Sequence, residues 1–319
     1  MVETIVLESG VLAREHRSLV YWPQGDCRGP QPVLYLFRGR GEEWFAKPPE
    51  RHGRNLVSVV EHLIDLEYLS PFVIVCPDIV EEECHYCAFD LAEPPPSLGT
   101  GKYRQFFTEE YFDLIEKKLF GGEQASENAS HTTAHSSTHH ATVHSSTHAT
   151  ARAIGGFSLG SLAAFTIAFL RPDLFTAVSS YDGAFLYWNY DHPEGYGPPE
   201  NDLRFDWFPY WFGSSPDWNS FVQANPHSLL QNAAGRRLHG LSRMTYFMHS
   251  SAEDHVTANA WREDKLYRAL LECGFQQGFE EVLLSPDSVH DWYWVDEHLY
   301  RLLPPLSRLL WQKHKYHTK

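Results

Sequence analysis

A serine between two glycines is the clearest chemical signal in this sequence. Gly156-Phe157-Ser158-Leu159-Gly160 matches the pattern G-x-S-x-G within an otherwise apolar run. Burying a hydroxyl there without a partner would be costly, whereas a sharp turn between a strand and a helix would present it as a nucleophile. Glycines leave room for such a turn, and the following helix N-terminus stabilises negative charge. We therefore interpret Ser158 as a nucleophile, with a structural serine as the alternative.

A nucleophilic serine needs a base and a carboxylate that orients the base. His290 follows a late predicted strand and lies beside an aromatic cluster, which distinguishes it from the other histidines among the 19 in the chain. Asp254 follows the strand predicted before that one, and it is the preferred acid. Glu253 is its near rival, and Asp182, at the end of an earlier strand, is a third candidate. In α/β-hydrolases the chain order is serine, acid, histidine, which each of these choices satisfies.

Two backbone N–H groups are expected to stabilise the oxyanion that forms during such a reaction. One belongs to Leu159, directly after the nucleophile. The other is assigned to Arg40, because Gly39 and Gly41 let the backbone approach closely after an early predicted strand. This loop is rich in charge, and mutual pairing is favoured over an arginine that binds an anionic substrate group. Its charged residues are Arg38, Arg40, Glu42 and Glu43.

Short apolar runs alternate with helical patterns, and this order predicts a mostly parallel or mixed sheet covered by helices. The first two runs are interpreted as an antiparallel pair. A helix is predicted around 56–66, a buried helix over 161–170, and an amphipathic helix over 258–274 that Gly274 caps. The predicted strands are 3–9, 17–23, 32–37, 72–77, 151–157, 175–182, 244–250 and 279–286.

Four segments together resemble a family of α/β-hydrolase esterases. They are LYLFRGRGEEW, GGFSLGSLAAF, SAEDH and VHDWYW. The family includes S-formylglutathione hydrolases, feruloyl and enterochelin esterases and the mycolyltransferases. The resemblance spans nearly the whole chain, and it implies an α/β-hydrolase fold with a mostly parallel central sheet, flanking helices and a nucleophile elbow. It also implies a serine-dependent carboxylic ester hydrolase with Ser158, Asp254 and His290 as the triad.

The sequence departs from that family in two places. Relatives often carry His-Gly or Asp-Gly where this chain has Arg38-Gly39, and the tryptophans after His290 are more closely spaced than usual. These differences bear on the second oxyanion donor and on the substrate class rather than on the triad. The reaction implied by the family needs no metal and no organic cofactor.

Two segments interrupt a chain that we otherwise expect to form one domain over 1–319. Residues 121–152 are a low-complexity insertion rich in Ser, Thr and His, with too few apolar side chains to offset the entropy of ordering. We expect disorder there rather than a metal site. Residues 185–221 are rich in aromatic side chains, and we interpret them as a cap-like loop that lines a substrate pocket, packs onto the body, or does both.

Composition excludes several partners. A formal net charge of −15 and a pI near 5.6 argue against nucleic acid and against an anionic membrane surface. The acidic start has neither the basic nor the long apolar region of a signal peptide, and five cysteines without a scaffold pattern fit reduced thiols. We therefore expect a cytoplasmic protein. The pair Cys84 and Cys87 is interpreted as structural, since no second pair accompanies it.

Three functions remain open at this point. The first is a serine esterase that acts on a small-molecule ester. The second is an acyltransferase that uses the same triad with a sugar or alcohol acceptor, to which the aromatic loop is suited. The third is a non-catalytic binding protein of the same fold. The sequence leaves the acyl group, the alcohol and the oligomeric state undetermined.

Overall fold

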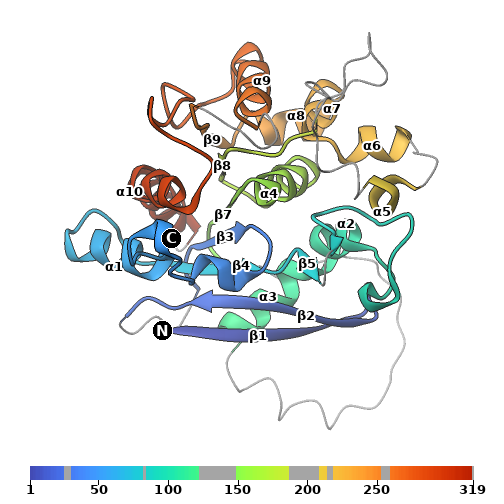
Figure 1. Ribbon diagram of the computed structural model, residues 1–319, viewed down its shortest axis with the longest axis horizontal. Helices are drawn as coiled ribbons and strands as arrows, with labels where there is room; N and C mark the ends of the chain where they lie inside the picture. Colours follow the sequence, from blue (N-terminus) through green and yellow to red (C-terminus); the bar gives the residue numbers. More distant parts are fainter. Residues whose placement is uncertain are drawn as a thin grey trace.

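The computed structural model describes residues 1–24, 30–81, 84–121, 149–186, 208–213, 218–252 and 259–317. Within these ranges a seven-stranded sheet runs through the molecule in the order β1-β2-β4-β3-β7-β8-β9 (Figure 1). Its strands are β1 (Val2–Ser9), β2 (Arg14–Tyr21), β3 (Val33–Phe37), β4 (Val73–Pro77), β7 (Arg152–Phe157), β8 (Ala177–Tyr181) and β9 (Thr245–His249). A small antiparallel pair, β5 (Val80–Glu81) and β6 (Cys84–His85), lies apart from this sheet.

The direction of the strands follows from their hydrophobic patterns. Buried residues alternate with more exposed ones in β2 and at the end of β1, and the two strands pair antiparallel, as predicted. In contrast, β3, β4, β7, β8 and β9 are buried along their whole length and pair parallel, β4 with β3, β3 with β7, β7 with β8 and β8 with β9. Continuous apolar runs are typical of parallel strands that are covered on both faces. The predicted mostly parallel sheet is therefore confirmed.

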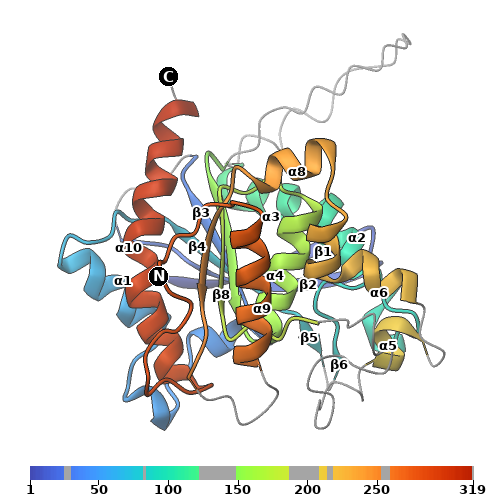
Figure 2. The ribbon, with the colours of Figure 1, turned by 90° about the horizontal axis from the view of Figure 1, so that it is seen from above.

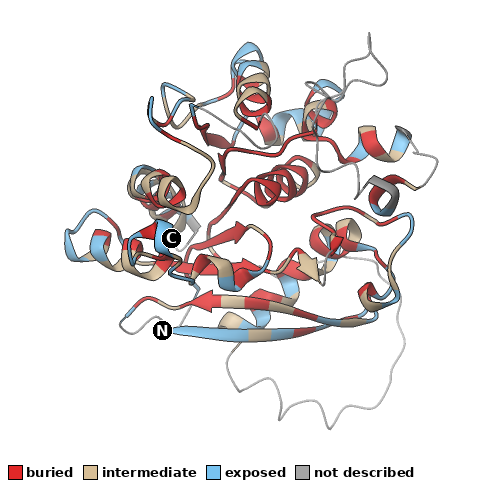
Figure 3. Cartoon of the chain, viewed as in Figure 1, coloured by how far each residue is buried: buried red, intermediate tan, exposed pale blue. Residues whose placement is uncertain are grey.

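Helices cover both faces of the sheet. Figure 2 shows α1 and α10 together on one side, with α3, α4 and α9 on the other. Eleven residues of α4 are buried, so this helix lies in the centre of its layer (Figure 3). The helices are α1 (Leu56–Asp65), α2 (Tyr103–Gln105), α3 (Tyr111–Phe120), α4 (Leu159–Leu170), α5 (Phe208–Phe212), α6 (Trp218–Ala224), α7 (Pro226–Gln231), α8 (Gly235–Leu241), α9 (Asn259–Glu272) and α10 (Trp292–His317). Shorter turns are η1 (Gly41–Trp44), η2 (Pro49–Arg51), η3 (Pro96–Leu98) and η4 (Phe106–Glu110).

Most predicted elements are present, but the last predicted strand is not. Residues 279–286 are irregular and join the sheet edge only through isolated pairings, such as Ser250 with Leu283. Two hydrogen bonds carry this contact: the Ser250 N–H donates to the Val282 carbonyl, and the Leu284 N–H donates to the Ser250 carbonyl. Paired glutamates before this point and Pro286 after it leave too short an alternating run for a ladder.

The two interrupting segments lie mainly outside the described residues. This applies to 122–148 of the low-complexity insertion and to 187–207 and 214–217 of the aromatic loop. The part of the aromatic loop that is described packs onto the body: Trp211 is buried, its indole N–H donates to the His85 carbonyl, and its ring lies 4.9 Å from that of Phe89. Among the described residues, no helix is both long and apolar enough to cross a membrane.

Candidate active site

Ser158 occupies a strained turn between β7 and α4. Its backbone has φ 57° and ψ −120°, a region that residues other than glycine rarely adopt and that costs about 1–3 kcal/mol. Two hydrogen bonds hold this geometry: the Ser158 N–H donates to the Tyr181 carbonyl at 3.1 Å, and the Ala184 N–H donates to the Ser158 carbonyl at 3.1 Å. The sharp turn that the glycine pattern predicts is therefore present, and β8 supports it.

The flanking glycines are required by close backbone approach. A Cβ atom on Gly156 would lie 2.3 Å from the carbonyl carbon of Gly160. A Cβ atom on Gly160 would lie 1.9 Å from the Phe37 carbonyl oxygen at the end of β3. No side chain fits within these distances. The first turn of α4 can therefore pack against β3 only if positions 156 and 160 are glycine.

His290 lies beside this turn and contacts a carboxylate. Its Nδ1 atom is 3.2 Å from Oδ2 of Asp182, and its ring centroid is 4.6 Å from that of Phe157, the residue before the serine. The Tyr181 hydroxyl donates to the Val289 carbonyl at 2.8 Å. The loop that carries the imidazole is thus tied to the end of β8.

Asp182 is held rigidly at the end of β8. It is fully buried and has a φ of 47°. Its Oδ1 accepts a hydrogen bond from the Ser251 N–H at 2.6 Å, and its own N–H donates to the His249 carbonyl at 3.0 Å. The site therefore supplies an oriented acceptor for one imidazole nitrogen.

The preferred acid of the sequence analysis, Asp254, lies outside the described residues, as does its rival Glu253. Both follow β9, which pairs parallel with β8 with Tyr181 opposite His249. Residues that follow two adjacent parallel strands emerge at the same edge of the sheet. The structure brings the third candidate, Asp182, to His290, and the roles of Asp254 and Glu253 remain predictions.

The two predicted oxyanion donors differ in their surroundings. Leu159 is the first residue of α4. Its N–H therefore has no acceptor carbonyl in a preceding turn of the helix. The Arg40 N–H donates to Oε1 of Glu43 at 2.7 Å, within the first turn of η1. Use of this second donor in catalysis would require Glu43 to release it, and its assignment remains a prediction.

A second carboxyl group, which the sequence analysis missed, supports the segment that carries Asp182. Oε2 of Glu263 accepts hydrogen bonds from the Ser180 hydroxyl at 2.7 Å and from the Gly183 N–H at 2.5 Å. Its Oε1 is buried and has no hydrogen-bond partner among the residues that the structure describes. Burial raises the pKa of Glu263 well above its usual value, and the nearby Asp182 adds to this. In the sequence, Glu263 reads as the charged face of a helix, so only packing identifies it.

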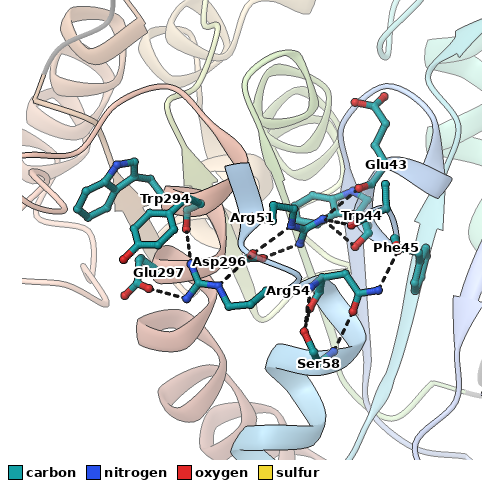
Figure 4. Close-up of polar contacts among 12 residues, drawn as sticks. Glu43, Trp44, Phe45, Arg51, Arg54, Ser58, Trp294, Asp296 and Glu297 are labelled. Atoms are coloured by element: carbon teal, nitrogen blue, oxygen red, sulfur yellow. Dashed lines mark hydrogen bonds and ion pairs between the residues drawn. The ribbon is translucent and has the colours of Figure 1, made fainter. Parts of the chain in front are cut away.

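A buried ion pair fixes the loop after β3 to the start of α10 (Figure 4). Arg51 has no exposed surface, and its guanidinium donates to both carboxylate oxygens of Asp296, at 3.0 and 2.6 Å. The same side chain donates to the backbone carbonyls of Glu43, Trp44 and Ala46. These contacts join the loop of the predicted oxyanion donor to the helix that directly follows His290.

The remaining motifs lie apart from this site. Cys84 and Cys87 are buried, and burial raises the pKa of Cys84 to about 11. In the described ranges, no group of three His, Cys, Asp or Glu side chains is arranged to hold a metal ion. The histidines of 131–148 lie outside those ranges.

No family model and no curated protein sequence matches this chain, but solved structures do. A ferulic acid esterase shares 19% identity and a TM-score of 0.64, covering 97% of this chain and 98% of its own. An S-formylglutathione hydrolase from Agrobacterium tumefaciens shares 17% identity and a TM-score of 0.62, covering 100% and 96%. A CE1 ferulic acid esterase from Anaeromyces mucronatus, solved with ferulic acid, shares 13% identity and a TM-score of 0.56, covering 95% and 89%.

These similarities establish the fold. The order of strands, the flanking helices and the strained serine turn define this chain as an α/β-hydrolase in architecture. The predicted fold class is confirmed. At such low identity, fold alone does not assign a function, so the chemistry has to be argued from the site.

Proposed function

We propose that this protein is a serine-dependent carboxylic ester hydrolase that acts through an acyl-enzyme on Ser158. One observation carries the proposal: the contact of 3.2 Å between His290 Nδ1 and Asp182 Oδ2, directly beside the strained turn that bears the serine. Serine hydrolases use this arrangement, in which a buried carboxylate orients an imidazole beside the serine hydroxyl. The esterases among the structural neighbours support the same reaction.

In the proposed mechanism, Ser158 Oγ attacks the ester carbonyl carbon while His290 Nε2 accepts the hydroxyl proton. The N–H of Leu159 donates to the oxyanion, and the dipole of α4 adds to its stabilisation. His290 then returns the proton to the leaving alcohol. Water, activated by the same imidazole, attacks the acyl-enzyme and releases the acid and the free serine.

For the orienting acid we propose Asp182, with Asp254 as the competing assignment. Asp182 is the carboxylate in direct contact with the Nδ1 atom of His290, and it is fully buried. It would hold the tautomer in which Nδ1 carries the hydrogen, and it would stabilise the imidazolium that forms when Nε2 accepts a proton.

The reaction itself is tested with p-nitrophenyl butyrate. We expect wild-type protein to release p-nitrophenol, Ser158→Ala to lose this activity, and a fluorophosphonate to label Ser158 alone. Ser242→Ala is the matched control, because Ser242 is exposed at the end of α8. Hydrolysis that survives in Ser158→Ala, or a wild-type protein that is neither active nor labelled, contradicts the proposal.

The acid is tested by comparing Asp182→Asn with Asp254→Asn. We expect Asp182→Asn to lower kcat by about 10⁴-fold, because an amide would hold the wrong tautomer. Asp254→Asn should retain most activity. The reverse ranking would move the acid to the loop after β9 and leave the serine mechanism intact.

A further inference from the structure

Arg38 lies next to the catalytic constellation. It is the first residue after β3, at the edge of the sheet where β7 and β8 present Ser158 and Asp182. Its guanidinium carbon is 4.7 Å from the centroid of the Phe157 ring, and that ring packs against His290 at 4.6 Å. This cation and the proposed base therefore pack against the same phenyl ring.

The glutamates of the same loop do not pair with Arg38. The sequence analysis favoured mutual pairing, but Glu42 pairs with Arg17 at 3.3 Å, and Glu43 accepts the Arg40 N–H. In the part of the chain that the structure describes, no carboxylate lies within ion-pair distance of the Arg38 guanidinium, and its buried Nε has no hydrogen-bond partner.

Two buried arginines among the described residues, Arg51 and Arg152, have carboxylate partners. Arg51 pairs with Asp296, and Arg152 pairs with Glu116 at 2.7 Å. A buried guanidinium without such a partner loses hydration and gains no ion pair, which is costly. Arg38 differs from these two: its Nε is buried without a partner among the described residues, while the rest of the side chain stays accessible to a ligand.

Arg38 also acts on a residue of the β5–β6 pair, His85. Burial is the main cause that lowers the pKa of Arg38, and the Glu43 carboxylate only partly opposes it. After burial, Arg38 and Arg40 are the charges that lower the pKa of His85 to about 4. Arg38 remains partly exposed, so a solute can reach its outer side.

We propose that Arg38 determines specificity by binding a carboxylate group of an anionic ester substrate. The proposal rests on the proposed esterase function and names its substrate class. A guanidinium presents two parallel N–H donors that match a carboxylate, and the Phe157 ring supports the Arg38 guanidinium at 4.7 Å. One unpaired cation matches one negative charge, which favours a carboxylate over a more highly charged group.

The test uses two matched pairs of esters. In the first pair, mono-p-nitrophenyl succinate carries a carboxylate on the acyl side, and p-nitrophenyl butyrate is its neutral counterpart. In the second pair, 4-acetoxybenzoate carries a carboxylate on the alcohol side, and its methyl ester is the neutral counterpart. We expect wild-type protein to prefer the anionic ester in one pair. Arg38→Met should lower kcat/KM for that ester about 10- to 100-fold, mainly through KM, and leave the neutral ester within about twofold. Arg38→Lys should be intermediate, since it keeps the charge and loses the fork.

The controls separate this proposal from the function on which it rests. Arg268→Met removes an exposed arginine that already pairs with Asp264, so it should change neither pair of rates. Arg38→Met should unfold at the same denaturant concentration or a higher one, because it removes no ion pair of the described residues and removes a buried Nε that has no partner there. Equal losses on anionic and neutral esters, or a wild-type protein without preference in both pairs, would overturn the role of Arg38. Hydrolysis of p-nitrophenyl butyrate that depends on Ser158 would still support the esterase.

Discussion

The buried pair of Arg51 and Asp296 allows a sharp test of what holds the site together. Asp296→Asn keeps the shape of the side chain and removes its charge, which leaves the Arg51 guanidinium without a counter-ion at a position with no exposed surface. Removing one partner of a buried ion pair costs about 3–5 kcal/mol. Arg51 keeps three backbone acceptors and the face of Trp292 at 4.8 Å, so we expect a loss near 3 kcal/mol.

The assay is urea unfolding followed by tryptophan fluorescence, arranged as a double-mutant cycle. Arg51→Met combined with Asp296→Leu should recover part of the loss, because neither charge then remains buried. The surface pair of Arg268 and Asp264 serves as a control, and breaking it should change the free energy of unfolding far less than breaking the buried pair does. If Asp296→Asn costs no more than this control, the reasoning about buried charge is refuted.

Three further predictions concern packing and pH. Gly160→Ala should cost about 1–3 kcal/mol and abolish activity, because its Cβ meets the Phe37 carbonyl; urea unfolding and p-nitrophenol release check this. Burial lowers the pKa of His249 to about 2 and that of His298 to about 3. The pKa values of both histidines are lower in the folded than in the unfolded protein, so the free energy of unfolding should fall as pH drops below about 6.5. Unfolding series at pH 7.5, 6 and 5 should show a weaker pH dependence for His298→Asn than for wild type. The pKa of Glu263 is raised, so stability should instead fall as pH rises above its unfolded value; Glu263→Gln should gain stability over wild type at pH 8, and equal curves would contradict a neutral buried carboxyl.

The sequence predicts the sheet and the serine turn well because both depend on local pattern. Short, mostly apolar runs such as 72–77 and 151–157 favour strands covered on both faces, and the structure has strands there. The glycines at 156 and 160 are required by backbone contacts within and directly beside the turn. Residues 279–286 carry a similar apolar run but lack the length to pair, and whether a sheet edge accepts them depends on Ser250, which is distant in the sequence.

Charge pairing is predicted poorly, because it depends on side-chain direction. The loop with two arginines and two glutamates looks self-neutralising in the sequence, yet Glu42 turns to Arg17 on β2 and Glu43 turns to a backbone N–H. The buried partner of Arg51 lies 245 positions away. No spacing rule connects such residues, so the ion pair and the unpaired Arg38 become visible only in three dimensions.

The choice of the acid shows the same limit at the centre of the site. Asp182 and Asp254 follow β8 and β9, and these strands are neighbours with Tyr181 opposite His249. Any carboxylate after either strand therefore starts at the same edge, and the path of a few loop residues decides which one reaches the imidazole. The Ser251 N–H and the backbone of His249 hold Asp182 towards His290. If Asp182→Asn and Asp254→Asn each lowered kcat only a few-fold, while the double variant lost about 10⁴-fold, the two carboxylates would substitute for one another. We expect instead that the effects of the two substitutions on log kcat add, and that Asp182→Asn causes most of the loss. The reason is that Asp182 already occupies the position beside Nδ1 of His290.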